Sequence, residues 1–151
     1  FSAMTYLALC SEHLGDNETA VRLYREAIRR SKLQGTPYAW AYVSYAKLLR
    51  QSGDDAQALR VLEESEKICP EAHGLASLGQ LLAAQGQKAR AELVLRRAIG
   101  MDPGISEAHY RLSVLLRASG RPEEAQAEMK RFEDAKELEE KIKNKISAIR
   151  K

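Results

Sequence analysis

Cysteine, aromatic residues and long apolar runs are all scarce in this sequence. Two cysteines, Cys10 and Cys69, are too few for a disulfide framework, and we expect both to be small buried side chains. No run of eighteen apolar residues occurs, so no membrane-spanning helix is expected. Aromatic residues make up only 6% of the chain and β-branched residues are few, which argues against a sheet protein.

The sequence also lacks a strong excess of charge of either sign. The 24 basic and 21 acidic residues leave a net charge of +3, which is too small to indicate binding to nucleic acid or to a membrane surface. No leader pattern is present, and the chain begins at Phe1 inside a helical pattern. We therefore expect a piece of a longer protein, whose compartment the sequence does not identify, with the cytoplasm slightly favoured.

The residues that are abundant are helix formers. Ala, Leu, Glu, Lys and Arg supply 81 of the 151 residues. A chain of this length can bury a core of its own.

A repeated skeleton organises the chain. Four glycines lie 38, 33 and 34 residues apart, namely Gly15, Gly53, Gly86 and Gly120. An alanine follows each glycine by five residues (Ala20, Ala58, Ala91, Ala125), and a large side chain follows four residues later (Tyr24, Leu62, Leu95, Met129). Each unit therefore predicts a helix that ends at a glycine in the left-handed conformation, a short turn, and a second antiparallel helix.

Helix caps and periodicity predict eight helices, at about 2–14, 18–32, 37–52, 55–68, 71–85, 88–100, 105–119 and 122–148. Asp16 and Asp54 suit the turns, Pro122 suits the first turn of the last helix, and Thr36 is an expected N-cap before Pro37. Small residues in the first helix of each unit face the alanine of the second and let the two backbones approach closely, as Gly79 and Ala91 do in the third unit.

This skeleton resembles the tetratricopeptide repeat. The third unit matches the family pattern closely, with Leu75, Leu78, Gly79, Leu82, Gly86, Ala91, Leu95, Ala98 and Pro103. The fourth unit departs from it, because Phe132 stands where the family has a small residue and no closing proline follows. The resemblance implies an all-α fold: an α-solenoid of four stacked antiparallel helical hairpins in a right-handed superhelix. Residues 1–132 would hold the four repeats (about 1–34, 38–70, 71–103 and 105–137), followed by a helical extension over 133–151.

No catalytic or ligand-binding motif is found in the sequence. The histidines His13, His73 and His109 have no metal-ligand spacing, and no phosphate loop or nucleophile motif occurs. His109 is expected to be a packing residue. We therefore expect no enzyme activity, no cofactor and no metal.

The resemblance also implies where a partner would bind, because the first helices of such hairpins line a concave groove. The groove positions with side chains that dominate interfaces are Tyr6, Trp40, Lys47, Arg50, His73, Tyr110, Arg111 and Arg117. The family's chaperone-binding carboxylate clamp needs Lys, Asn and Arg at set groove positions, where this chain has Thr5, Leu9, Ser44, His73 and Ser77. That mechanism is rejected, and an acidic and apolar protein or peptide segment is the expected partner.

The last segment predicts one long amphipathic helix. Its apolar stripe continues through Leu138, Ile142, Ile146 and Ile149, beyond the reach of the fourth hairpin, and is a possible homo-oligomer contact. Two i,i+4 pairs, Glu137–Lys141 and Glu139–Lys143, would support the helix.

Three functions remain open: a non-catalytic scaffold that binds a partner in its groove, a structural or oligomerisation module that uses the last helix, and a regulatory arm of an upstream enzyme.

Overall fold

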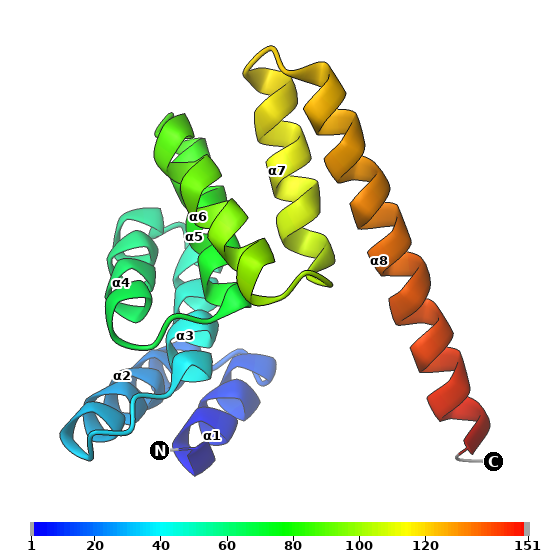
Figure 1. Ribbon diagram of the computed structural model, residues 1–151. Helices are drawn as coiled ribbons and strands as arrows, with labels where there is room; N and C mark the ends of the chain where they lie inside the picture. Colours follow the sequence, from blue (N-terminus) through cyan, green and yellow to red (C-terminus); the bar gives the residue numbers. More distant parts are fainter. Residues whose placement is uncertain (1, 150–151) are drawn as a thin grey trace.

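The chain folds into helical hairpins. The computed structural model describes residues 2–149, and this range contains eight α-helices and no strand (Figure 1). The helices are α1 (Ser2–His13), α2 (Asn17–Leu33), α3 (Ala39–Gln51), α4 (Asp55–Ile68), α5 (Ala72–Ala84), α6 (Lys88–Met101), α7 (Ser106–Ala118) and α8 (Pro122–Ile149). Phe1 and the last two residues of the expected extension, Arg150 and Lys151, lie outside the described residues.

The helices pair in chain order and the pairs stack. Each odd-numbered helix packs against the helix that follows it, and each hairpin packs against the next (Figure 1). The odd-numbered helices also contact one another, as α1 does with α3, α3 with α5 and α5 with α7. This arrangement confirms the predicted all-α fold of stacked hairpins with a long C-terminal helix.

The turns between the helices have the predicted glycine conformations and N-caps, with one exception at the start of α3. Gly53 and Gly86 have φ angles of 82° and 78°, and the Asp54 side chain accepts a hydrogen bond from the backbone N–H of Gln57. The predicted start of the third helix at Pro37 is wrong, because α3 begins at Ala39 after an extended Tyr38. This extended backbone places the Tyr38 ring against Trp40, with 6.1 Å between the ring centroids.

Small residues are buried where the helices of a hairpin meet. Ala91 is fully buried, and a Cβ atom on Gly79 would lie 2.6 Å from Cγ of Leu95 and 3.4 Å from the carbonyl oxygen of Ala91. The predicted close approach of the two helices is therefore confirmed in the third hairpin.

The last helix is about twice as long as the helix it pairs with. α8 is continuous over 28 residues, and its C-terminal half extends beyond the start of α7 (Figure 1). The Glu137–Lys141 pair forms at 2.6 Å, whereas Glu139 bonds to Lys136 and Ser106 instead of the expected Lys143. Glu139 turns toward α7 because Ser106 lies at the start of that helix, within 2.8 Å.

Two further expectations concern exposure. Cys10 is exposed and Cys69 is partly buried, so the expected burial of both cysteines is wrong. Within residues 2–149, α1 contacts only α2 and α3, and neither covers Cys10. Among the described helices, none combines the length and apolar character needed to span a membrane.

Candidate partner-binding groove

A depression of about 760 Å³ lies between α3, α5 and α7. Five of the residues expected to face a partner line it, namely Trp40, Lys47, Arg50, His73 and Arg111. We call this depression the groove. Its other polar lining residues are Glu71, Ser77, Gln80 and Glu107.

The α1 side of the groove ends in an aromatic cluster. The rings of Tyr6 and Trp40 lie 5.2 Å apart between centroids, and Tyr38 lies at the edge of Trp40. Tyr6 is 60% exposed, so this cluster presents ring surface to solvent. Such exposed aromatic surface can bury an apolar side chain of a partner at a low cost in side-chain entropy.

Two arginine side chains, Arg50 and Arg111, lie in the groove, and not all of their N–H groups have a hydrogen-bond partner within the described residues. Arg50 of α3 donates from Nη1 to Oε1 of Gln80 on α5, over 2.8 Å. The Nε atoms of Arg50 and Arg111 are buried and have no hydrogen-bond partner within the described part of the chain. The two side chains are 32% and 30% exposed, so a ligand that supplies acceptor oxygens can hydrogen-bond to the parts of the guanidinium groups that reach solvent.

The acidic residues of the groove are already engaged. Glu71 accepts hydrogen bonds from the backbone N–H groups of His73 and Gly74, over 2.9 and 3.0 Å, and so caps α5. Glu107 pairs with Arg111 at 3.3 Å. Arg50 pairs with Asp55 at 3.9 Å, whereas Lys47 makes no ion pair within residues 2–149. Three basic side chains (Lys47, Arg50, Arg111) and two acidic ones (Glu71, Glu107) line the groove, which leaves a small excess of positive charge.

A second depression, of about 330 Å³, continues the groove along α7. Gln80 and Arg111 line both, so the two form one surface. Tyr110 lies here, 5.4 Å from the Phe132 ring of α8, and the Arg111 guanidinium is 5.9 Å from the Tyr110 ring. The contact with Phe132 explains why a large residue stands at this normally small position, since it fills the space beside Tyr110.

Arg117 lies apart from the other candidates. It lines a separate depression between α7 and α8, together with Glu123, Gln126, Met129, Lys130 and Glu133. The four apolar residues of the expected oligomer contact lie on the free half of α8, outside the groove.

His109 is buried as expected, but its surroundings are polar. Its Nδ1 lies 2.7 Å from Oε2 of Glu128, and its Nε2 lies 3.0 Å from the carbonyl oxygen of Pro103. Glu128 is itself only 5% exposed and pairs further with Arg131. This network joins α7 to α8, away from the groove.

Within residues 2–149, no cluster of three or more His, Cys, Asp or Glu side chains is placed to hold a metal ion.

The sequence reasoning missed two groove contacts. It did not anticipate the bond between Arg50 and Gln80 or the packing of Phe132 on Tyr110. The first could have been found, because the two residues are 30 apart and fall at neighbouring groove positions of consecutive units. The second depends on how α8 crosses α7, which the spacing does not show.

The stacked hairpins and the concave surface of their first helices define a helical-repeat protein. Two tetratricopeptide repeat models match the chain, one over residues 1–71 and the other over residues 77–138. The chain belongs to the tetratricopeptide repeat family. This repeat is generally a protein-interaction module and typically a non-catalytic scaffold.

Individual proteins resemble the chain in sequence or in fold. The chain is 31% identical, over 132 residues, to the cellulose synthase 2 operon protein C of Komagataeibacter xylinus, and the match covers 85% of the chain. It spans only 10% of that relative's length. A MamA crystal structure superposes with a TM-score of 0.74 at 18% identity, covering 93% of this chain and 80% of that one. A tetratricopeptide repeat protein from Parabacteroides merdae gives a TM-score of 0.73 at 16% identity, over 86% of this chain and 51% of that one.

Proposed function

We propose that this chain is a non-catalytic scaffold that binds an acidic and apolar segment of a partner protein in the groove. The observation that carries the proposal is the gathering of Trp40, Lys47, Arg50 and Arg111 around one depression. These residues come from α3 and α7, which are separated by three helices in the sequence, so only the stacking of hairpins brings them together.

The chemistry of the groove supports this partner class. Arginine and large aromatic residues contribute most of the binding energy at protein interfaces. The partly exposed guanidinium groups of Arg50 and Arg111 would donate hydrogen bonds to carboxylate oxygens of the partner, and the Tyr6–Trp40 cluster would cover an apolar side chain.

A charge-reversal pair tests the proposal. Proteins retained by the immobilised chain from an extract of its source cells would be compared between Lys47→Glu and Lys67→Glu. Both lysines are exposed and both changes alter the net charge equally, but Lys67 is on α4, outside the groove. A partner lost only with Lys47→Glu supports the groove. Equal retention by both variants would refute it.

A further inference from the structure

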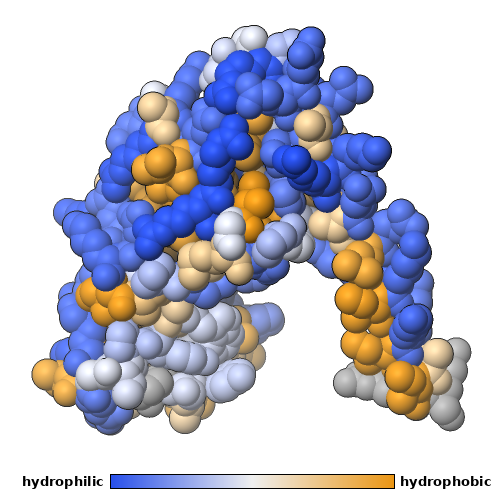
Figure 2. Space-filling view, viewed as in Figure 1, coloured by the Kyte–Doolittle hydropathy of each residue, from blue (hydrophilic) through white to orange (hydrophobic). Residues whose placement is uncertain are grey.

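The free half of α8 presents an apolar stripe that no residue between 2 and 149 covers. Leu138, Ile142, Ile146 and Ile149 are 57%, 50%, 48% and 84% exposed. We call these four residues the α8 stripe. Figure 2 shows apolar surface along this half of the helix, on the side turned toward the hollow between α8 and the first hairpins. A contiguous exposed apolar surface of this kind marks an interaction site.

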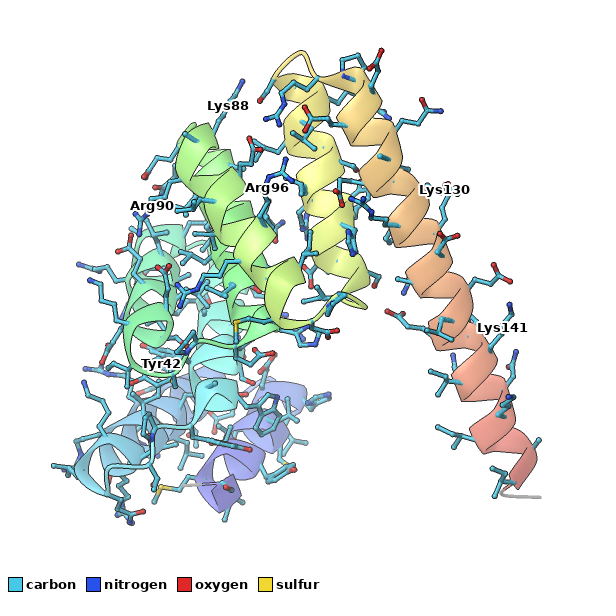
Figure 3. The ribbon with its side chains drawn as sticks, viewed as in Figure 1. Tyr42, Lys88, Arg90, Arg96, Lys130 and Lys141 are labelled. Carbon is cyan, nitrogen blue, oxygen red and sulfur yellow. The ribbon has the colours of Figure 1, made fainter. Side chains whose placement is uncertain are left out.

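The direction of the stripe argues against a following repeat as its cover. Glu124 precedes Ile142 by eighteen residues, about five helical turns, so the two lie on the same face of α8. Glu124 pairs with Arg96 of α6, which belongs to the preceding hairpin, at 3.4 Å. The stripe therefore faces back toward the array, whereas a further hairpin would stack on the opposite side. Lys130 and Lys141 extend from the side of α8 turned away from the array (Figure 3).

The stripe begins at the edge of the groove. Glu139, next to Leu138, accepts a hydrogen bond from Oγ of Ser106 at the start of α7, over 2.8 Å. Hydrogen bonds from Lys136 and Ser106 lower the pKa of Glu139, and the nearby His73 contributes a smaller lowering. Because Ser106 is adjacent to Glu107, which lines the groove, the start of the α8 stripe lies beside the groove.

Charge indicates what would fill this hollow. The lining of the groove has one basic side chain more than it has acidic ones, and Lys47 has no ion pair within residues 2–149. Residues 142–149 of α8 contain Lys143 and Lys145 and no acidic residue, whereas Lys141 points away from the array and pairs with Glu137. An occupant would therefore be acidic where it faces the groove and the flanks of α8, and apolar where it meets the stripe.

We propose that the groove and the α8 stripe together clamp an acidic amphipathic helix of a partner protein. A helix satisfies its own backbone hydrogen bonds and presents an apolar stripe to that of α8. The stripe runs from Leu138 to Ile149, about 17 Å, so the bound helix has at least about three turns. This inference rests on the proposed function, and it adds α8 as the second wall of the site and a helix as the ligand.

A designed peptide serves as the probe. It is a lactam-stapled helix of about 18 residues, with Leu at i, i+3, i+4 and i+7 spacing and Glu on the other face, labelled with fluorescein. Its binding is measured by fluorescence anisotropy with the parent chain, with the double variant Ile142→Gln/Ile146→Gln, and with Lys47→Glu. The matched control is Leu93→Gln on α6, which removes an apolar side chain that is 71% exposed and lies outside the groove. A second peptide has Lys in place of every Glu.

The clamp predicts that the Glu peptide binds the parent and the control equally. Its affinity falls more than tenfold with the double variant and with Lys47→Glu, and the Lys peptide does not bind. An affinity that falls only with Lys47→Glu would overturn the clamp and leave the groove function standing. Absence of binding to the parent would overturn the clamp. An affinity that neither variant changes would refute both the clamp and the groove function. Light scattering completes the test: a dimer of the parent that the double variant abolishes would assign the stripe to a second copy and overturn the clamp.

Discussion

Single residues fix the distance between the helices of each hairpin. Gly79 and Ala91 are small because Leu95 and the backbone of α6 lie against the position of a Gly79 Cβ atom. Gly100, also in α6, has no atom within 4 Å of the position of its Cβ. Added side-chain atoms should therefore have opposite effects at Ala91, which is fully buried, and at Gly100, where there is space.

Ala91→Leu is expected to destabilise the fold by roughly 1–3 kcal/mol, because the added atoms overpack a fully buried contact. Chemical denaturation monitored by circular dichroism measures the change. Gly100→Ala is the control, and it should leave stability unchanged or raise it by up to about 1 kcal/mol through helix propensity. A denaturation midpoint of Ala91→Leu equal to that of the parent would mean that the close packing is assigned wrongly.

His109→Leu is expected to cost about 1–3 kcal/mol, because it removes a hydrogen-bond partner from the buried Glu128 carboxylate. The double variant His109→Leu/Glu128→Leu should recover part of this loss, since no buried carboxylate then remains. Urea denaturation of the two single variants and the double variant gives the coupling energy. Strictly additive effects would show that the pair does not act as a unit.

At the scale of elements, α8 has two halves with different surroundings. Its first half packs against α7 through Ala125, Glu128 and Phe132, whereas every described residue from Lys136 to Ile149 is exposed. The hydrogen bond from Ser106 of α7 to Glu139 supports the start of this half, and the rest of the helix has only local pairs such as Glu137–Lys141 within the described residues.

Amide hydrogen exchange should therefore change along α8. We expect residues 141–149 of the isolated chain to exchange much faster than residues 125–135, because helix ends without packing open locally. Mass spectrometry of peptic fragments resolves the two halves. Equal protection along the whole helix in a dilute sample would mean that the α8 stripe is covered.

An ion-pair network links α6 to α8 and should make their contact pH-dependent. Partial burial acts to raise the pKa of Glu92, but hydrogen bonds from Arg121 and Arg96 lower it overall, below its ordinary value of 4.5. A lowered pKa in the folded state means that the stabilisation is present above pH 4.5 and is lost as the pH falls through the folded value. Arg121→Gln should reduce the loss of stability between pH 5 and pH 3, approximately the span of that titration. Thermal denaturation across this range tests the expectation, and an unchanged slope would contradict it.

At the scale of the whole molecule, the sequence predicted the scaffold better than the surfaces. The repeated glycines and alanines predict the hairpins because one backbone geometry recurs and each copy needs the same small residues. The start of α3 at Ala39 was missed because it depends on the contact between Tyr38 and Trp40. The pairing of His109 with Glu128 and the direction of the α8 stripe depend on how two helices cross, and neither follows from the spacing within one helix.

The central claim is that the groove holds the partner, and its most direct test is a binding titration. A partner segment recovered with the parent chain is titrated by calorimetry into the parent and into Trp40→Ala/Arg111→Ala. The account predicts that the affinity of the double variant falls more than tenfold, because it loses an aromatic contact and a cation that face the same depression. An affinity equal to that of the parent, in a double variant with unchanged circular dichroism, would show that the partner binds elsewhere.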